Sequence, residues 1–447
     1  MTVLAVDVGS SSVKAAVLRN GRVVGRIARE AFPTRFDAGK AEVSPDELLT
    51  AFAGAVRSLG ESASRADVIA LAAMAPSWLA MDRKGKPLTP IITHQDRRSV
   101  DEALWLERVF GQKRLLDLTG NRPFPGGISS TTARWMSQHR RGVLRRADLV
   151  GHVTTYLHRI LTGARVTDPS NASFMGVYDT LGRGGWHDEL LMATGLSRSQ
   201  MPQVVDASAA AGRLTMSAAS LLGLPAGLPM LAGVMDTSAA VLLAGAADGQ
   251  LINVCGTTDV LAMCVSRPQP HPQLLTRALG TGRMWLQVST LASAGSTLNW
   301  LHATMYGDMT QTEFYRTIAG LIAAKPPGPR ATANDRDDRA DVSFAPYLGG
   351  DRMSITQPTG GFTNLTLATS REDMLAAALN ALARASAARL PLLAACGIRH
   401  RRSVLVSGAA GGAISEVLHR HWKGRWTFTI EKEATLRGLA KLAAAAA

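Results

Sequence analysis

A lone carboxylate, Asp236, lies between an apolar segment and a run of small residues in the stretch GVMDTSAAVLLAGAADGQ, residues 233–250. An unpaired ionised carboxylate in apolar surroundings is costly, so a carboxylate at this place needs either a partner or a task. Two roles fit, because Asp is a favoured helix N-cap and a positioned carboxylate can act as a general base. The roles are compatible, since a helix N-terminus favours the ionised form of a nearby carboxylate.

Two turns of glycine followed by hydroxyl residues form an internal repeat. VDVGSSSVKAAVL (6–18) aligns with NVCGTTDVLAMCV (253–265), and in each an apolar strand enters the turn and a second one leaves it. Glycine lets the backbone approach a ligand closely, and successive amides with hydroxyl groups can donate to an anion. Two such turns in two related halves predict a polyphosphate held between two lobes. The turn residues are Gly9, Ser10, Ser11 and Ser12 in the first half and Gly256, Thr257 and Thr258 in the second.

Asp7 ends the strand before the first turn, and Lys14 lies on the strand after it. A carboxylate at a strand end can hold Mg²⁺ through water, because that ion takes few protein carboxylates and keeps several waters. The alternative is that Asp7 only caps the turn. Lys14 fits a phosphate contact and an exposed strand residue equally well.

Asp96 and Arg98 stand two residues apart, so on an extended segment both side chains face one side. A carboxylate and a guanidinium there suit the recognition of a polyol, and the alternative is a surface ion pair. Trp78 offers a flat apolar face for a sugar, although a buried tryptophan is more often part of a core.

Other ligand motifs were compared with the sequence. There is no G-x-x-x-x-G-K-[ST], no H-E-x-x-H and no paired C-x-x-C, which excludes a P-loop and leaves a zinc site without support. VLVSGAAGGAIS (404–415) imitates a dinucleotide fingerprint, with Glu431 or Glu433 as its acidic partner. Too few residues follow Gly408 to complete such a domain, so an NAD-dependent reductase stays the weaker alternative.

The elements that must position these residues follow from periodicity and turn signals. Asn20-Gly21 predicts a hairpin between two strands, and Ser44 predicts the start of a helix over 45–60. Strands that alternate with helices indicate an α/β protein. The other expected elements are strands near 68–76, 79–88, 228–232 and 403–408, helices over 238–246, 371–396 and the last residues, a hairpin at 250–266, and a connector at 325–341.

Composition limits the class of protein. With 447 residues, of which 46% are hydrophobic, the chain exceeds the usual size of one core, so at least two domains are expected. The first residues resemble a strand and not a signal peptide, and no apolar run is long enough to span a membrane. Three isolated cysteines are expected to be reduced core residues, and the expected location is the cytoplasm. These are Cys255, Cys264 and Cys396.

The formal charge of +14 permits an anionic partner. The basic clusters at 139–146 and 399–402 lack the zinc-finger spacing or interleaved aromatic residues of nucleic-acid modules. They are interpreted as solvated surfaces, and no nucleic-acid partner is expected. The excess charge can still draw an anionic small molecule toward a cleft.

Taken together, the motifs resemble the FGGY carbohydrate kinases, which belong to the superfamily of sugar kinases, actin and heat-shock chaperones. The resemblance covers nearly the whole chain and includes ITHQDRRS (92–99), AGSTLNWL (294–301), FAPYLGGDR (344–352) and VLVSGAAGGAIS (404–415). It implies two ribonuclease-H-like, actin-like ATPase domains with a cleft between them. The implied domains are an N-terminal sugar-binding domain over 1–230 and a C-terminal ATP-binding domain over 231–447.

The resemblance also implies roles for single residues. Asp236 becomes the catalytic base and a substrate contact, Asp7 becomes the Mg²⁺ ligand, and ATP is the phosphoryl donor. Further substrate contacts are Pro76, Ser77, Trp78, Asp96 and Arg98. The implied ATP contacts are Gly9, Ser10, Ser11, Ser12, Lys14, Gly256, Thr257, Thr258, Gly295, Asn299, Gly408, Ala409, Ala410 and Gly412. A homodimer is compatible with the resemblance.

Several positions depart from the family pattern. Thr132 replaces a usual lysine, Asn364 a usual glycine and Asn380 a usual acidic residue. Asp259, beside the second turn, would repel phosphate unless a metal or an arginine offsets it. Ala75-Pro76 and His94 replace residues typical of xylulose kinases. The expected substrate is a ketose such as xylulose or sedoheptulose, and the alternatives are a gluconate or polyol kinase and a catalytically weak sugar or nucleotide sensor.

Overall fold

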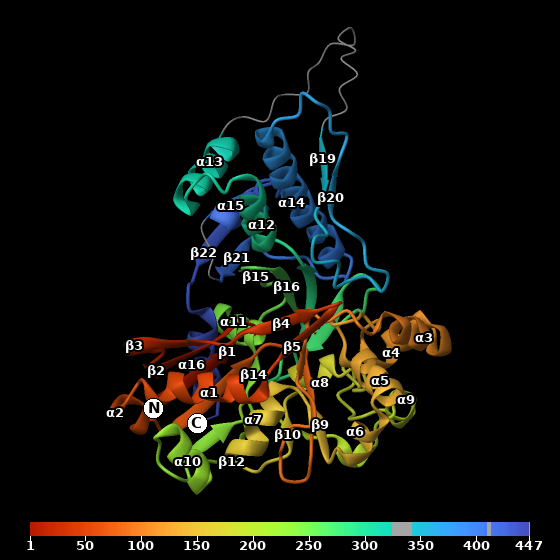
Figure 1. Cartoon of the computed structure of the whole chain (residues 1–447). Helices are drawn as coiled ribbons and strands as arrows, with labels where there is room; N and C mark the ends of the chain where they lie inside the picture. Colours follow the sequence, from red (N-terminus) through yellow and green to blue (C-terminus); the bar gives the residue numbers. More distant parts are fainter. Residues whose placement is uncertain (324–341, 409–412, 447) are drawn as a thin grey trace.

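The computed structural model describes residues 1–323, 342–408 and 413–446. Figure 1 shows two lobes, with the N-terminal half below and most of the C-terminal half above. Each lobe contains a mixed β-sheet with helices packed on it. The predicted α/β class is therefore confirmed.

The sheet of the lower lobe begins with an antiparallel meander, β1–β2–β3. The hairpin predicted at Asn20-Gly21 is confirmed, because both residues have positive φ angles and join β2 to β3. β6 adds parallel to β1, and β14 pairs with β6. The strands are β1 Thr2–Val8, β2 Ser12–Arg19, β3 Arg22–Ala31, β6 Val68–Ala73, β12 Ala210–Arg213, β13 Pro229–Leu231 and β14 Val234–Met235.

The sheet of the upper lobe repeats this arrangement. β15 and β16 form the predicted hairpin, β18 extends it in antiparallel order, and β21 adds parallel to β15. β15, β16 and β21 thus correspond to β1, β2 and β6, which confirms that the internal repeat is a structural one. The strands are β15 Leu251–Cys255, β16 Asp259–Val265, β17 Leu275–Ala278, β18 Trp285–Leu291, β21 Ser403–Ser407 and β22 Thr427–Ile430.

A further sheet in the lower lobe has the order β4-β5-β8-β7-β9, and two short strand pairs complete the β structure that the described residues form. Its strands are β4 Thr34–Asp37, β5 Lys40–Val43, β7 Ser77–Met81, β8 Ile91–Thr93 and β9 Leu149–Gly151. The short pairs are β10 Val166–Thr167 with β11 Gln203–Val204, and β19 Ser343–Ala345 with β20 Gly361–Thr363.

Two of the expected helices begin at a capping residue, and the one expected over 238–246 begins two residues earlier, at Asp236. Ser44 caps α1 by accepting from the Glu47 amide, and Ser370 caps α14, the long helix expected over 371–396. The helices of the lower lobe are α1 Pro45–Arg57, α2 Glu61–Ser64, α3 Val100–Phe110, α4 Gln112–Thr119, α5 Ser129–His139, α6 Arg141–Arg146, α7 Val153–Leu161, α8 Pro169–Phe174, α9 Asp188–Thr194, α10 Met216–Leu222, α11 Asp236–Ala244 and α16 Ala434–Ala444. Those of the upper lobe are α12 Gly295–Met305, α13 Gln311–Ala323, α14 Arg371–Ala394 and α15 Ala413–His419.

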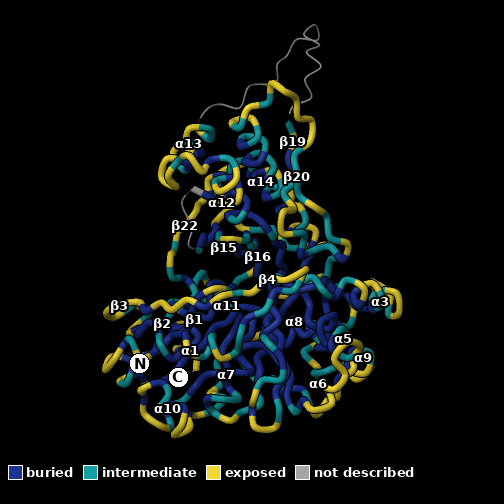
Figure 2. Tube along the Cα trace, in the orientation of Figure 1, coloured by how far each residue is buried: buried dark blue, intermediate teal, exposed yellow. Residues whose placement is uncertain are grey.

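The last helix returns to the first sheet. Leu436 and Leu439 of α16 pack with Val3 and Ala5 of β1 in one apolar cluster. Both chain ends therefore lie in the lower lobe, and Figure 2 shows buried strands at the centre of both lobes. The predicted division at residue 230 falls inside a segment that packs on the first sheet, because β14 joins β6.

Three smaller expectations remain. All three cysteines are free and buried, as predicted. No helix within the described residues is long and apolar enough to cross a membrane. The connector expected at 325–341 lies outside the described residues.

Candidate active site

Asp236 begins α11 at the point where β14 ends. The N-cap of this helix is Met235 and not Asp236, which corrects the capping alternative: the carboxylate belongs to the first helical residue. Its Oδ1 atom accepts from the amide of Thr237 at 2.5 Å and from the Thr237 hydroxyl at 3.0 Å. Oδ2 makes no hydrogen bond with the described residues, so it is free to accept one from a ligand.

The strand before Asp236 is held in a narrow space. Gly233 has a φ of +83°, and a Cβ atom there would lie 2.6 Å from the carbonyl oxygen of Leu71. The amide of Met235 donates to the Ser170 hydroxyl at 3.1 Å. The backbone on the N-terminal side of Asp236 is therefore fixed by a close approach to β6 and by α8.

A buried histidine supports the same segment. His158 Nε2 lies 3.0 Å from the carbonyl oxygen of Leu231 and 3.1 Å from that of Ala232. Burial lowers the pKa of His158 to about 4, although the two carbonyl groups act in the opposite direction. His158 is thus neutral near pH 7 and donates its single N–H to these carbonyls.

Asp7 lies beside Asp236. Its Oδ1 atom is buried and has no hydrogen-bond partner among the described residues. The pKa of Asp7 is raised to about 7, chiefly by burial and then by the charge of Asp236, while Lys14 acts in the opposite direction. Two neighbouring carboxylates, one with an unpartnered oxygen, suit a divalent cation that keeps most of its waters. Within the described residues no group of three or more His, Cys, Asp or Glu side chains could hold a metal.

Lys14 pairs opposite Asp7 in the β1–β2 ladder. Its Nζ lies 3.0 Å from Glu433 Oε2, and both side chains are one quarter exposed. Glu431 forms an ion pair with Arg437. Both candidates for the acidic residue of a dinucleotide site are therefore already engaged by cations.

The first turn keeps two of its amides open. The amide of Gly9 donates to the carbonyl of Ser12 at 3.0 Å. The carbonyls of Ser10 and Ser11 accept from the Thr34 hydroxyl and the Phe32 amide. The amides of Ser10 and Ser11 donate to no acceptor among the described residues, which is the arrangement an anion requires.

The second turn is surrounded by other predicted ATP contacts. The Gly256 amide donates to the Thr258 carbonyl at 2.9 Å, and the Thr257 carbonyl accepts from two amides at the start of α12. A Cβ atom at Gly295 would lie 2.5 Å from the Gly256 carbonyl oxygen, and one at Gly408 would collide with the backbone of Cys255. Gly256, Gly295 and Gly408 are thus brought together. Asn299 is exposed on α12, and Ala409, Ala410 and Gly412 lie outside the described residues.

Asp259 does not face this turn as a free charge. It is fully buried and forms an ion pair with Arg389, which is only 3% exposed. Asn253 Nδ2 donates to Asp259 Oδ1 at 2.5 Å, and Arg389 also donates to the Ser386 hydroxyl at 2.9 Å. An arginine offsets Asp259, as the sequence required for a phosphate turn at this position.

The predicted sugar contacts on β7 lie in a core. Trp78 is fully buried in an apolar cluster with Ile92 and Val150, and its Nε1 has no partner among the described residues. The Ser77 hydroxyl donates to the Met74 carbonyl at 2.8 Å. This placement favours the core role for Trp78. Pro76 directly precedes these two residues.

Asp96 and Arg98 face each other, as their spacing predicted. Arg98 Nη2 donates to Asp96 Oδ2 at 2.7 Å and to Glu42 at 2.5 Å, and the Ala41 amide donates to Asp96 at 2.8 Å. The side chains are 2% and 7% exposed, so the pair is buried and not a surface ion pair. Asp96 and Arg98 therefore satisfy each other's charge, and their hydrogen bonds to Ala41 and Glu42 fix the loop that follows β8.

Three arginines were missed by sequence reasoning. Arg97 lies between the two residues just described, Arg352 ends the FAPYLGGDR motif, and Arg277 interrupts the apolar segment LLTRAL. Arg277 Nη1 lies 2.8 Å from the sulfur of Met235, one residue before Asp236. A charged residue inside an apolar strand was the signal that could have found it.

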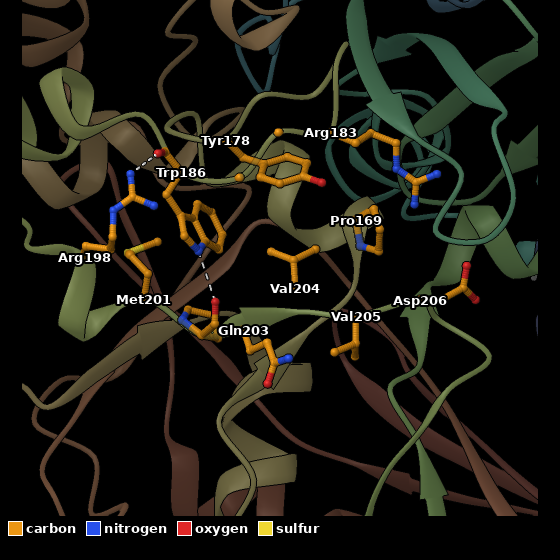
Figure 3. A pocket seen from close by; sticks show the side chains of 13 residues that line it. Pro169, Tyr178, Arg183, Trp186, Arg198, Met201, Gln203, Val204, Val205 and Asp206 are labelled. Carbon is orange, nitrogen blue, oxygen red and sulfur yellow. Dashed lines mark hydrogen bonds between the residues drawn. The ribbon is translucent and has the colours of Figure 1, made fainter.

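A cavity of about 700 Å³ lies elsewhere in the lower lobe. Figure 3 shows Tyr178, Trp186, Arg198 and Asp206 among its lining side chains. None of the predicted catalytic, ATP or substrate residues lines it, so this cavity is not the candidate active site.

Two family models match the chain. The N-terminal domain of the FGGY family of carbohydrate kinases matches residues 2–243, and the C-terminal domain of the same family matches residues 251–419. The xylulose kinase of Escherichia coli K12 is 29% identical over 418 residues, covering 91% of this chain and 82% of the relative. The gluconokinase of Bacillus subtilis is 24% identical, covering 84% of this chain and 74% of the relative. A crystal structure described as a xyloylose kinase from Brucella ovis aligns with a TM-score of 0.83 at 25% identity, covering 100% of this chain and 90% of that one.

Proposed function

Because the chain belongs to the FGGY family of carbohydrate kinases and is therefore a sugar kinase, we propose that it transfers the γ-phosphoryl group of ATP to one hydroxyl of a small sugar, with Asp236 as general base. The observation that carries the proposal is the free Oδ2 atom of Asp236 beside Asp7. Oδ1 is held by Thr237, so Oδ2 is the atom that accepts the proton of the sugar hydroxyl.

The two glycine turns bind the phosphates in this proposal. The open amides of Ser10 and Ser11 face the anion from the lower lobe, and the Gly256–Thr258 turn faces it from the upper lobe. Phosphoryl transfer depends on positioning and on neutralising phosphate charge, which donors from two sides supply. Asp7 would hold Mg²⁺ through water, and that ion supplies positive charge to the phosphates when bound.

A ketose, gluconate or a polyol as the substrate would be phosphorylated by the same chemistry. These alternatives differ only in the contacts that the sugar site must make. The xylulose kinase and gluconokinase relatives support both a ketose and a sugar acid. A sensor without turnover would have no use for a general base, and Asp236 is present with a free oxygen. We therefore favour an active enzyme over a sensor.

The experiment that tests the proposal is a screen for sugar-dependent ADP formation. Purified protein with Mg²⁺ and ATP is given ketoses, alditols and aldonates in turn. ADP release that depends on one class of sugar supports the kinase. ADP formation that is absent, or equal with and without every sugar, would contradict it.

A further inference from the structure

Two arginine side chains, Arg277 and Arg352, are buried without a carboxylate at ion-pair distance among the described residues. Arg277 is 1% exposed and Arg352 is 7% exposed. In the described part of the chain no carboxylate lies within 4.0 Å of either guanidinium, whereas the buried Arg389 and Arg98 both have one. An unpaired buried charge is strongly unfavourable, and arginine does not escape by losing its proton. The protein therefore holds two buried cations that a ligand can pair.

Arg277 has only weak partners. It projects from β17, its Nη1 contacts the sulfur of Met235 at 2.8 Å, and its Cζ lies 5.7 Å from the centre of the Phe174 ring. Its Nε is buried and has no partner among the described residues. A thioether is a weak acceptor, so most of the donors of this fork remain available.

Arg352 comes from a different element, the loop after β19. Its Nε is also buried and unpartnered within the described residues. A Cβ atom at Gly127 would lie 3.2 Å from the Arg352 carbonyl oxygen, which places the loop against the lower lobe. Arg97 contacts the same loop, because it donates to Gln357 at 3.1 Å. It also donates to the His94 carbonyl at 2.8 Å, and both acceptors are neutral groups.

The charges of these residues act on one another. Burial lowers the pKa of Arg352 to about 9, with Arg97 and Arg277 lowering it and Asp236 raising it. Burial lowers the pKa of Arg277 to about 10, while Asp236 and Asp168 oppose the shift. Asp168 already accepts from Ser170 and Asn171. The charge of Asp236 therefore acts on both arginines, and the contact with Met235 places Arg277 against the residue that precedes Asp236.

We propose that the sugar accepted by this kinase carries a carboxylate, as in an aldonic or keto-aldonic acid, and that Arg277 and Arg352 bind that group; this rests on the proposed function. A carboxylate matches the guanidinium fork, and charge-assisted hydrogen bonds are the strong ones. A neutral polyol would leave both cations unpaired in the complex. The phosphates of ATP are already provided for by the two glycine turns.

The first test compares acids with neutral sugars of the same configuration. Sugar-dependent ADP formation is measured with pentonates and hexonates, with the matching pentitols and hexitols, and with xylulose and ribulose. The best acid is expected to exceed the best neutral sugar in kcat/KM by about 10- to 100-fold. A neutral sugar that equals or exceeds every acid overturns this proposal and leaves the kinase intact. Absence of sugar-dependent ADP formation with all compounds overturns both.

The second test removes one guanidinium. Arg277→Met keeps an unbranched chain without the charge, Arg277→Lys keeps a charge without the fork, and Arg283→Met removes an exposed arginine nearby as the matched control. Arg277→Met is expected to reduce the preference for acid over neutral sugar by about 10- to 100-fold, with Arg277→Lys intermediate and the control unchanged. If Arg277→Met instead lowers kcat for both sugars equally, Arg277 serves the transferred phosphoryl group and the proposal is wrong.

A melting experiment separates ligand binding from folding. Without ATP, the preferred acid should raise the melting temperature of the wild type and of Arg283→Met but not that of Arg277→Met. Arg277→Met itself is expected to be no less stable than the wild type, because it removes a buried charge that has no counter-ion. Equal stabilisation of wild type and Arg277→Met by the acid would contradict the assignment.

Discussion

The two halves of the molecule contain the same glycine-turn hairpin and put charge on it differently. In the lower lobe Asp7 lies before the glycine turn, with one unpartnered oxygen and a raised pKa. In the upper lobe Val254 takes the aligned position, and the carboxylate of that hairpin, Asp259, is buried against Arg389. One scaffold can thus offer a carboxylate to a ligand or neutralise it internally. The difference depends on whether an arginine from another element reaches it.

The largest effect is expected at the chemical centre of the lower lobe. Asp236→Asn keeps the shape and the hydrogen bonds to Thr237 but cannot take a proton at neutral pH. We expect kcat to fall by about two to four powers of ten with little change in ATP affinity. Steady-state kinetics and equilibrium ATP binding check this, with Asp82→Asn, in the turn after β7, as control. Near-normal turnover in Asp236→Asn would remove it from the mechanism.

The next effect is one of stability in the upper lobe. Asp259→Asn leaves Arg389 buried without a counter-ion and should lower the free energy of unfolding by about 3–5 kcal/mol. The double variant Asp259→Asn/Arg389→Met should recover most of this loss. Denaturant unfolding measures both, and Asp248→Asn, at an exposed hydrogen-bonded carboxylate, is the control. A loss in Asp259→Asn no larger than in the control would show that the pair is not what neutralises the second hairpin.

The next effect is a pH dependence that arises at Asp7. Asp7 has a folded pKa of about 7 against 3.8 for the free side chain, so its contribution to stability is present below about pH 4 and is lost as pH rises through 7. Mg²⁺ must displace the same proton, so its apparent affinity should rise about tenfold per pH unit below pH 7 and level off above it. Titration of Mg²⁺ dependence between pH 5.5 and 8.5, about the span of the transition, checks this. A flat profile in the wild type, or an unchanged slope in Asp7→Asn, would exclude Asp7 as the titrating ligand.

The smallest effect is expected at the exposed tip of the second turn. Thr257→Val deletes one hydroxyl but keeps the volume, and should weaken ATP binding about 3- to 10-fold without changing sugar binding. Calorimetry with ATP measures this, and Thr304→Val, exposed on α12, is the matched control. Unchanged ATP affinity would mean that the Thr257 side chain does not contact phosphate.

Much of this fold follows from local pattern. The hairpin at Asn20-Gly21, the capped helix after Ser44 and the repeated glycine turns depend on neighbouring residues, and all were predictable. The buried arginines were not, because Arg277 reaches Met235 and the Arg352 loop reaches Gly127 only when β17 and a loop distant in sequence fold against the lower lobe. The spacing of Asp96 and Arg98 predicted that they face one side, but not that they would satisfy each other. Asp236 proved to be the first helical residue because Met235 takes the capping conformation.

The central claim is that the γ-phosphoryl group moves to a sugar hydroxyl and not to water. Phosphorus NMR of wild-type protein turning over Mg-ATP with the best sugar of the screen measures its destination directly. The account predicts a growing phosphomonoester signal that matches the ADP formed. In Asp236→Asn this phosphomonoester signal should be lost. Inorganic phosphate as the main product, with no sugar ester, would contradict it.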